Sequence, residues 1–260
     1  MELGLKGKTV LVTGASQGMG YEIARAFAEE GADLILVARS REKLTAVREA
    51  IADQFPVTIE VINLDITEKS AVTSIAAAAG NVDILVNNAG NIPNGDLWQV
   101  DAERWREGWA LKVLGYIDLT RAIYPILKAR GGGVIINNIG AGGDIHDAKY
   151  ICGTAGNASL MAFTRTLGGR SLDDGIRVVG VNPGTVNTKR LENVFRSKAL
   201  ETLGDADRYK ELFARMPAGR PAHIREIADT IVFLASARSS YTTGTIVTVD
   251  GGLSSRHSVL

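Results

Sequence analysis

Short apolar stretches rich in valine and isoleucine alternate with amphipathic stretches along the whole chain. The apolar stretches have no polar alternation, which is typical of parallel strands buried on both faces; they cover residues 9–14, 33–38, 57–65, 83–90, 132–140, 176–184 and 245–252. Apolar residues recur at helical spacing in residues 21–32, 41–54, 105–129, 158–171 and 224–236. This alternation predicts an α/β fold with a doubly wound parallel sheet and helices on both faces.

The chain shows no internal repeat, low-complexity tract or linker, so we expect one domain over residues 1–260. Its long stretch without a clear strand is residues 187–222, directly after the predicted strand 176–184. Ligands of such sheets bind beyond the carboxyl ends of the strands. We therefore expect residues 187–222 to form a mobile, partly helical substrate lid, with a merely decorative insertion as the alternative.

The segment TGASQGMG (13–20) joins the first predicted strand to the first predicted helix. Gly14 permits a tight turn, Gly18 lets the backbone approach a phosphate, and Gly20 lets the helix pack close to the strand. The helix N-terminus that follows offers free N–H groups and a positive dipole end. In this position the glycines predict a dinucleotide site, although a purely structural turn would have the same spacing.

The spacing TGxxxGxG, together with NNAG at 87–90, PGTVNT at 183–188 and VTVDGG at 247–252, resembles the short-chain dehydrogenase/reductase family. The resemblance spans almost the whole chain and implies a Rossmann-like fold with a nicotinamide dinucleotide cofactor. It implies adenine contacts, a ribose path and a carboxamide contact at the carboxyl ends of the strands. The implied cofactor residues are Gly14, Ser16, Gln17, Gly18, Met19, Gly20, Asp65, Ile66, Asn88, Ala89, Gly90, Ile139, Pro183, Gly184, Val186 and Thr188.

The residue that ends the second predicted strand should select between the two nicotinamide cofactors. An acidic residue there would accept a hydrogen bond from a ribose 2′-hydroxyl, but this chain has Ala38 followed by Arg39. The guanidinium offers a planar fork of donors suited to a phosphate. We predict NADP(H). NAD(H) is the alternative, with Arg39 stacked on adenine, and Gln17 stands where many NADP-preferring members of the family have a basic residue.

The family's catalytic residues are replaced in this sequence. The usual run YxASKAALxxFT aligns on GTAGNASLMAFT (153–164), which puts Gly153 at the tyrosine position and Asn157 at the lysine position. The serine position is Ala141, and the asparagine position on the long helix is Lys112. Asparagine and lysine are thus exchanged between two positions that the family places at one cavity.

Tyr150 stands three residues before Gly153, and three helical residues return to nearly the same face. We predict that Tyr150 is the acid/base, that Lys112 lowers its pKa, and that Asn157 completes the site. The alternatives are a wall position for Tyr150, pairing of Lys112 with Glu107 or Asp118, and a shifted alignment that puts Thr154 at the lysine position. His146, in a glycine-rich loop, is a further candidate acid/base.

The remaining composition excludes several other classes. Lys and Arg total 29 and Asp and Glu total 29, so no net field favours nucleic acid or an anionic membrane. Cys152 cannot form an internal disulfide, and no apolar run reaches bilayer length. His223 and His257 are expected to be structural or exposed, and no residues have metal-ligand spacing. We expect a cytoplasmic protein without metal.

These observations predict an NADP-dependent oxidoreductase that interconverts a carbonyl and an alcohol at an atypical site. A non-catalytic NADP(H)-binding protein (a sensor or an inactive partner subunit) and a lyase or isomerase on the same fold are the alternatives. The resemblance implies a homo-oligomer, a tetramer. The substrate is a small molecule, and apolar residues within 187–222 suit a partly apolar one.

Overall fold

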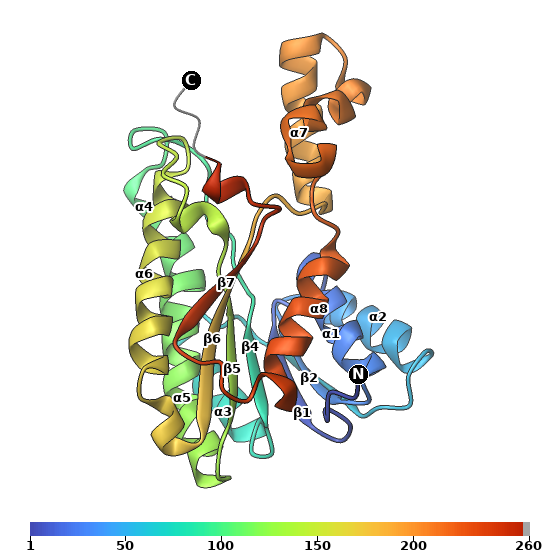
Figure 1. Cartoon of the computed structure of the whole chain (residues 1–260), viewed down its shortest axis with the longest axis vertical. Helices are drawn as coiled ribbons and strands as arrows, with labels where there is room; N and C mark the ends of the chain where they lie inside the picture. Colours follow the sequence, from blue (N-terminus) through green and yellow to red (C-terminus); the bar gives the residue numbers. More distant parts are fainter. Residues whose placement is uncertain (257–260) are drawn as a thin grey trace.

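The computed structural model describes residues 1–256 and contains one parallel sheet in the order β3-β2-β1-β4-β5-β6-β7 (Figure 1). The sheet follows from β-branched apolar stretches that can be buried on both faces. The strands are β1 (Thr9–Thr13), β2 (Asp33–Ala38), β3 (Ile59–Asn63), β4 (Ile84–Asn87), β5 (Gly133–Asn138), β6 (Ile176–Pro183) and β7 (Thr245–Val249). The predicted doubly wound α/β fold is confirmed.

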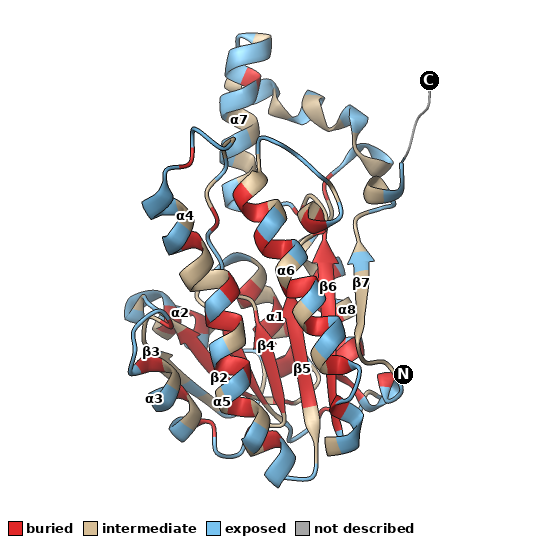
Figure 2. Cartoon of the chain, turned by 90° about the vertical axis from the view of Figure 1, so that its left-hand side faces the viewer, coloured by how far each residue is buried: buried red, intermediate tan, exposed pale blue. Residues whose placement is uncertain are grey.

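Helices cover both faces of this sheet (Figure 1). They are α1 (Gly18–Glu29), α2 (Arg41–Ala52), α3 (Ala71–Ala78), α4 (Ala102–Trp109), α5 (Gly115–Ala129), α6 (Ile151–Gly168), α7 (Lys189–Leu203) and α8 (Ile224–Ala235). Strand alternation divides the core: Val10 and Val12 pack with α1, α2 and α8, whereas Leu11 packs with α3 and α5. The buried residues concentrate on the strands and on the inner stripes of the helices (Figure 2).

The strand order reverses between β1 and β4, which are neighbours in the sheet although β2 and β3 lie between them in sequence. A crevice opens at such a switch point, beyond the carboxyl ends of the strands. The glycine turn after β1 and the segment NNAG around the end of β4 therefore meet at one place. The fold alone brings these two motifs together.

Three helical features differ from the expectation. Helix α6 begins at Ile151 and not at 158, because Gly153 and Gly156 weaken the helical pattern there yet lie under neighbouring side chains. Helix α3 was not predicted; its alanine-rich sequence buries only Ala71 and Ile75 and has little apolar periodicity. The long helix predicted over 105–129 is interrupted by a π-helical segment, Ala110–Leu114.

The predicted insertion forms an arm at the carboxyl ends of the strands. It consists of α7 and a 3₁₀ segment, Ala206–Arg215, which pack on each other and stand away from the sheet in both views (Figures 1 and 2). Phe195 and Phe213 meet edge to face at a centroid distance of 5.2 Å and join the two parts. The partly helical character is confirmed; movement of the arm stays a prediction.

Within residues 1–256, no helix combines the length and the apolar character needed to cross a bilayer.

Candidate functional site

The turn after β1 has the geometry that its glycines predict. Gly14 and Gly18 have φ values of +66° and +57°, which a side chain would strain. A Cβ at Gly20 would lie 2.1 Å from the carbonyl oxygen of Gly14, so only glycine allows α1 to approach this closely. Gln17 gives α1 no side-chain cap, and the first turn carries no acidic residue. The free N–H groups there suit an anionic group such as a pyrophosphate.

A hydrogen-bond network fixes the end of β4 against this turn. The hydroxyl of Thr13 accepts from the N–H groups of Asn88 and Ala89 at 2.9 and 3.0 Å. The Asn88 amide donates to the Thr13 carbonyl at 3.0 Å and accepts from the Asn138 amide at 2.8 Å. A Cβ at Gly14 would lie 2.9 Å from the Ala89 Cα. The predicted cofactor residues of β1 and β4 therefore form one rigid wall.

The predicted adenine end contains Arg39 and Asp65, whose charged groups lie 3.6 Å apart. Hydrogen bonds from Thr67 and the charge of Arg39 overcome the opposing effect of burial and lower the pKa of Asp65. Sequence reasoning missed Lys43, whose Nζ donates to the Gln17 side chain at 3.1 Å. Position 17 has no basic residue, but Lys43 from the first turn of α2 places its ammonium group beside it. Its place in that turn, three residues after Ser40, was the available signal.

The loop after β6 carries the other predicted cofactor residues. A Cβ at Gly184 would lie 2.6 Å from the Asp250 Cβ, so Gly184 permits the close approach of β7. Val186 is buried and bridges to Ala222 at the return of the arm. Thr188 caps α7 by accepting from the Leu191 N–H at 3.2 Å. Its O–H remains able to donate, as a contact to a carboxamide oxygen requires.

Tyr150 lies folded over Gly153, as the spacing of the two residues predicts. It is the N-cap residue of α6, and a Cβ at Gly153 would lie 2.0 Å from the Cζ of its ring. The ring also borders Gly142, where a Cβ would lie 3.2 Å from the Tyr150 Cε1. The phenol therefore fills the space into which a side chain at position 153 would project.

Lys112 lies in the π-helical segment and reaches across Gly90. Its Nζ donates to the Ile139 carbonyl at 2.5 Å, so the ammonium lies between two predicted cofactor residues. Burial, with a smaller contribution from the charge of Arg190, lowers its pKa to about 8. Within residues 1–256 it makes no ion pair with Glu107 or Asp118, so the alternative pairing of Lys112 is wrong. π-Helical turns are frequent at functional sites.

The electrostatics of Tyr150 differ from the prediction. Burial raises the pKa of its phenol; the charge of Arg190 opposes that shift, and Cys152 adds to it. Lys112 does not contribute, because its Nζ is directed to the Ile139 carbonyl. The prediction that Lys112 lowers the pKa of Tyr150 is wrong. Arg190, which sequence reasoning did not single out, is the cation that acts on the phenol.

Asn157 lies beside the same loop, with only 2% of its surface exposed. Its Oδ1 is buried and has no hydrogen-bond partner within the described part of the chain. Its Nδ2 would lie 3.2 Å from a Cβ at Gly140 and 3.4 Å from one at Gly142. A buried acceptor without a partner is costly, and the role of Asn157 in completing the site stays a prediction.

The remaining candidates lie outside this group. His146 is exposed in the loop before α6. His223 caps α8 in a capping box with Glu226, a structural role in agreement with the expectation, whereas His257 lies outside the described residues. Cys152 is buried beside Ile92 and Val100. No group of three or more potential metal ligands occurs in residues 1–256.

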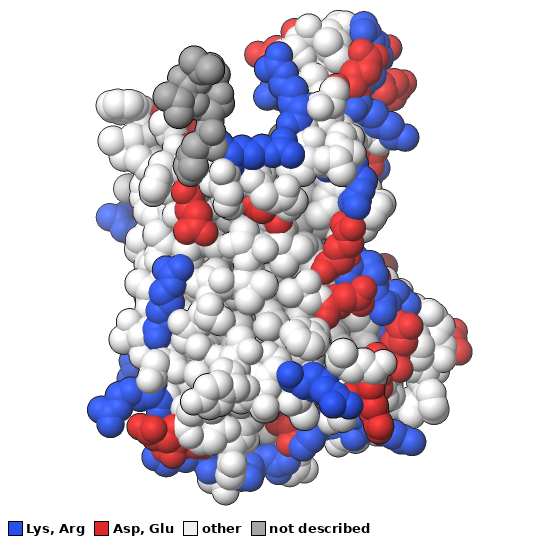
Figure 3. Space-filling view, viewed as in Figure 1, with Lys and Arg blue, Asp and Glu red and all other residues white. Residues whose placement is uncertain are grey.

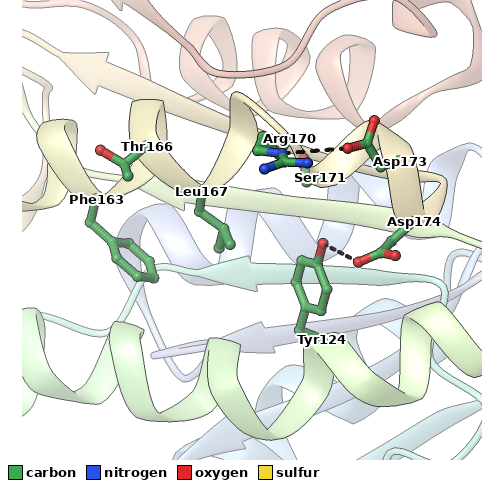
Figure 4. Close-up of a pocket in the computed structure, with 8 residues that line it drawn as sticks. All are labelled: Tyr124, Phe163, Thr166, Leu167, Arg170, Ser171, Asp173 and Asp174. Carbon is green, nitrogen blue, oxygen red and sulfur yellow. Dashed lines mark hydrogen bonds and ion pairs between the residues drawn. The ribbon is translucent and has the colours of Figure 1, made fainter.

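A groove of about 560 Å³ lies elsewhere, between α5 and α6 (Figure 4). Tyr124 of α5 and Phe163 of α6 both line it, and the Tyr124 hydroxyl donates to Asp174 at 2.9 Å. Because the 3₁₀ turn Ser171–Asp174 directly precedes β6, the groove lies toward the amino ends of the strands. It is therefore separate from the predicted cofactor residues, which lie at the carboxyl ends.

Comparisons with known proteins agree with this architecture. A family model described as "Enoyl-(Acyl carrier protein) reductase" matches residues 14–254. The 2-keto-3-deoxy-L-fuconate dehydrogenase of Xanthomonas campestris is 32% identical over 257 residues, which cover 96% of this chain and 81% of that protein. The glucose 1-dehydrogenase of Gluconobacter oxydans is 34% identical over 252 residues, 95% of this chain and 92% of that protein.

A similar solved structure is the L-sorbose reductase of Gluconobacter frateurii complexed with NADPH and L-sorbose. It has a TM-score of 0.93 and 32% sequence identity, and the match covers 99% of this chain and 100% of that one. Family model, relatives and structure all extend over nearly the whole chain. The chain belongs to the short-chain dehydrogenase/reductase family.

Proposed function

We propose that this chain is an NADP(H)-dependent oxidoreductase that interconverts a carbonyl and an alcohol, with Tyr150 as its acid/base. The observation that carries the proposal is the phenol of Tyr150 in the space above Gly153, at a crevice built for a dinucleotide. The same crevice holds Lys112 above Gly90 and the unpaired Oδ1 of Asn157. The site is thus atypical in sequence but retains a proton donor, an ammonium group and a free acceptor.

The residues present fit a dinucleotide phosphate. Gly20 allows the close approach of α1, the N-terminus of α1 lacks a side-chain cap, and Arg39 and Lys43 gather at the end of β2. Arg39 and Lys43 would contact a ribose 2′-phosphate, which favours NADP(H) over NAD(H). The L-sorbose reductase complex with NADPH supports this choice. When bound, the cofactor supplies or accepts the hydride.

The chain's own residues would handle the proton. Because burial raises the pKa of Tyr150, its phenol is protonated at neutral pH and can donate to the oxygen of a carbonyl undergoing reduction. The transfer leaves a negative charge on the Tyr150 phenolate, and the Lys112 ammonium would stabilise this charge. In the reverse direction Tyr150 would take the proton from the alcohol.

One observation favours a second candidate, a non-catalytic NADP(H)-binding protein. Lys112 is hydrogen-bonded to a backbone carbonyl and not to the phenol. Such a protein would bind NADPH tightly and transfer no hydride.

The test is NADPH consumption by the purified protein with ketoses, 2-oxo acids and aryl ketones. We expect turnover with at least one class, and Tyr150→Phe should lower kcat by about 100-fold or more while the Kd for NADPH stays unchanged. Turnover that survives in Tyr150→Phe would remove Tyr150 from the mechanism. NADPH binding without consumption of NADPH by the native protein would support the non-catalytic candidate.

We also propose that the chain works as a homo-oligomer, a tetramer by family resemblance. The groove between α5 and α6, where Tyr124, Phe163 and Leu167 lie beside the charged residues Arg170, Asp173 and Asp174, supports a protein contact on that face (Figure 4).

A further inference from the structure

The loop 90–95, directly after β4, is a meeting point for three elements. Lys112 from the π-helical segment packs on Gly90. Arg190 from the first turn of α7 donates to the Asn91 side chain at 3.3 Å and to the Ile92 carbonyl at 3.1 Å. Tyr150 packs against the buried cluster that contains Ile92, and its backbone bridges to Gly95.

Arg190 therefore holds the base of the arm against the loop that Lys112 and Tyr150 contact. It is the direct link between the chemistry of the crevice and the insertion. The arm projects beyond the carboxyl ends of the strands, and basic side chains line the side of the arm that faces the hollow below it (Figure 3). A ligand that enters between the arm and the sheet would pass this side.

The positive charge at this point is not neutralised within residues 1–256. Neither Arg190 nor Lys112 makes an ion pair there. Their like charges oppose each other, since Arg190 contributes to the lowered pKa of Lys112. Arg190 uses its two terminal nitrogens for single hydrogen bonds, which leaves further N–H donors of the guanidinium fork available.

We propose that Arg190 binds a carboxylate of the substrate, and that the enzyme acts on 2-oxo acids or the corresponding 2-hydroxy acids. This inference rests on the proposed oxidoreductase function and names its substrate class. A carboxylate held by the guanidinium fork would be neutralised beside Lys112, and the adjacent carbonyl would be presented to the Tyr150 phenol. The planar fork matches the geometry of a carboxylate in a bidentate contact.

The test is calorimetric binding to the protein–NADP⁺ complex, which cannot reduce a carbonyl, of matched pairs that differ only in charge. Pyruvate, 2-oxohexanoate and benzoylformate are compared with their methyl esters. Arg190→Gln should weaken the binding of the best-bound acid by about tenfold or more and leave the binding of its ester unchanged. The control Arg208→Gln removes one positive charge from the same arm at an exposed residue paired with Glu211, and it should leave both ligands unaffected.

Three results would overturn the inference. Equal weakening of acid and ester by Arg190→Gln would mean that Arg190 only anchors the arm. A loss confined to NADPH affinity would mean that the anion at Arg190 is a cofactor phosphate. No preference of the native protein for any acid over its ester would remove the carboxylate from recognition.

Failure of the proposed function has a different signature. Binding of an acid that depends on Arg190, without any NADPH consumption, would leave the anion site in place and remove the oxidoreductase function. Turnover of neutral ketones with no dependence on Arg190 would support the oxidoreductase function and exclude the carboxylate site at Arg190.

Discussion

The ring of Tyr150 packs directly on Gly153, so the glycine at the family's tyrosine position has a packing role. The ring of Tyr150 lies where the side chain of residue 153 would project, with 2.0 Å between an added Cβ and the ring Cζ. A tyrosine one turn earlier can therefore supply its hydroxyl only if position 153 has no side chain. At the scale of the residue, the loss of a side chain at position 153 and the presence of Tyr150 are therefore coupled.

This coupling predicts that the effect of Gly153→Ala on the free energy of unfolding changes sign when the Tyr150 ring is removed. Gly153→Ala should lower the free energy of unfolding by about 1–3 kcal/mol, because the ring must move out of a packed position. In the Tyr150→Ala background the same change should raise stability by up to about 1 kcal/mol, since alanine favours a helix over glycine. Urea unfolding of the four proteins of the cycle measures both values. The same sign in both backgrounds would contradict the packing of the ring on Gly153.

The buried ammonium of Lys112 should lower the free energy of unfolding by an amount that depends on pH. Its pKa is about 8 in the folded protein against 10.5 for the ordinary side chain, so the unfolded chain binds the proton more tightly. Stability is therefore reduced below pH 8, and the penalty is relieved as the pH rises toward 10.5. Lys112→Met should stabilise the protein by about 1–3 kcal/mol at pH 7, with a smaller gain at pH 10.

Denaturant unfolding at both pH values measures this gain. The control Lys149→Met changes an exposed lysine next to Tyr150 and should shift stability by less than about 0.5 kcal/mol at either pH. A gain from Lys112→Met that does not shrink with pH would show that the substitution acts through packing and not through the charge.

At the scale of the elements, the strands were predicted closely and the helices around the site were not. Strand β2 runs from Asp33 to Ala38 as predicted, because an apolar run bounded by polar residues states both ends. The start of α6 was missed because Gly153 and Gly156 are glycines for a tertiary reason. Added side chains there would meet the Tyr150 ring, Val113 and Ile92. Such contacts are set by tertiary packing and leave no periodic trace in the sequence.

The site shows the same limit. The glycine turn and NNAG were predictable because each motif carries its own local geometry. The π-helical segment under Lys112 and the contact of Arg190 with Ile92 were not, since both depend on how distant segments meet. The sequence predicts Lys112 as part of the site, but only the structure shows that its Nζ is directed to the Ile139 carbonyl.

The proposed choice of NADP(H) depends on the end of β2 and the first turn of α2. Arg39 follows β2, and Lys43 reaches Gln17 across the glycine turn. Arg39→Gln and Lys43→Gln should each weaken NADPH binding by about tenfold and leave NADH binding unchanged, because only NADPH carries a 2′-phosphate. Fluorescence titration with both cofactors measures this. Arg48→Gln, later on α2, is the control, and equal weakening for NADH would refute a phosphate contact.

At the scale of the whole molecule, two surfaces lie at opposite ends of the strands. The crevice with Tyr150 and Lys112 lies at the carboxyl ends, below the arm, whereas the groove with Tyr124 and Phe163 lies toward the amino ends (Figures 1 and 4). The separation allows a second copy to cover the groove without blocking the entry of a ligand. Assembly and catalysis can therefore be altered independently.

This separation gives the prediction for assembly. Phe163→Glu puts a charge beside Tyr124 and Leu167 in the groove, where a partner subunit would have to bury it; Arg170, the basic residue that lines the groove, is already paired with Asp173. We expect the oligomer to dissociate into smaller species, as measured by light scattering, while the Kd for NADPH of the dissociated protein stays within about twofold of the native value, since a distant site adds little coupling. The control Val194→Glu adds the same charge at a residue that is 45% exposed on the arm and should leave the mass unchanged. A native protein that is monomeric, or a Phe163→Glu variant that keeps the native mass, would exclude this groove as the contact between subunits.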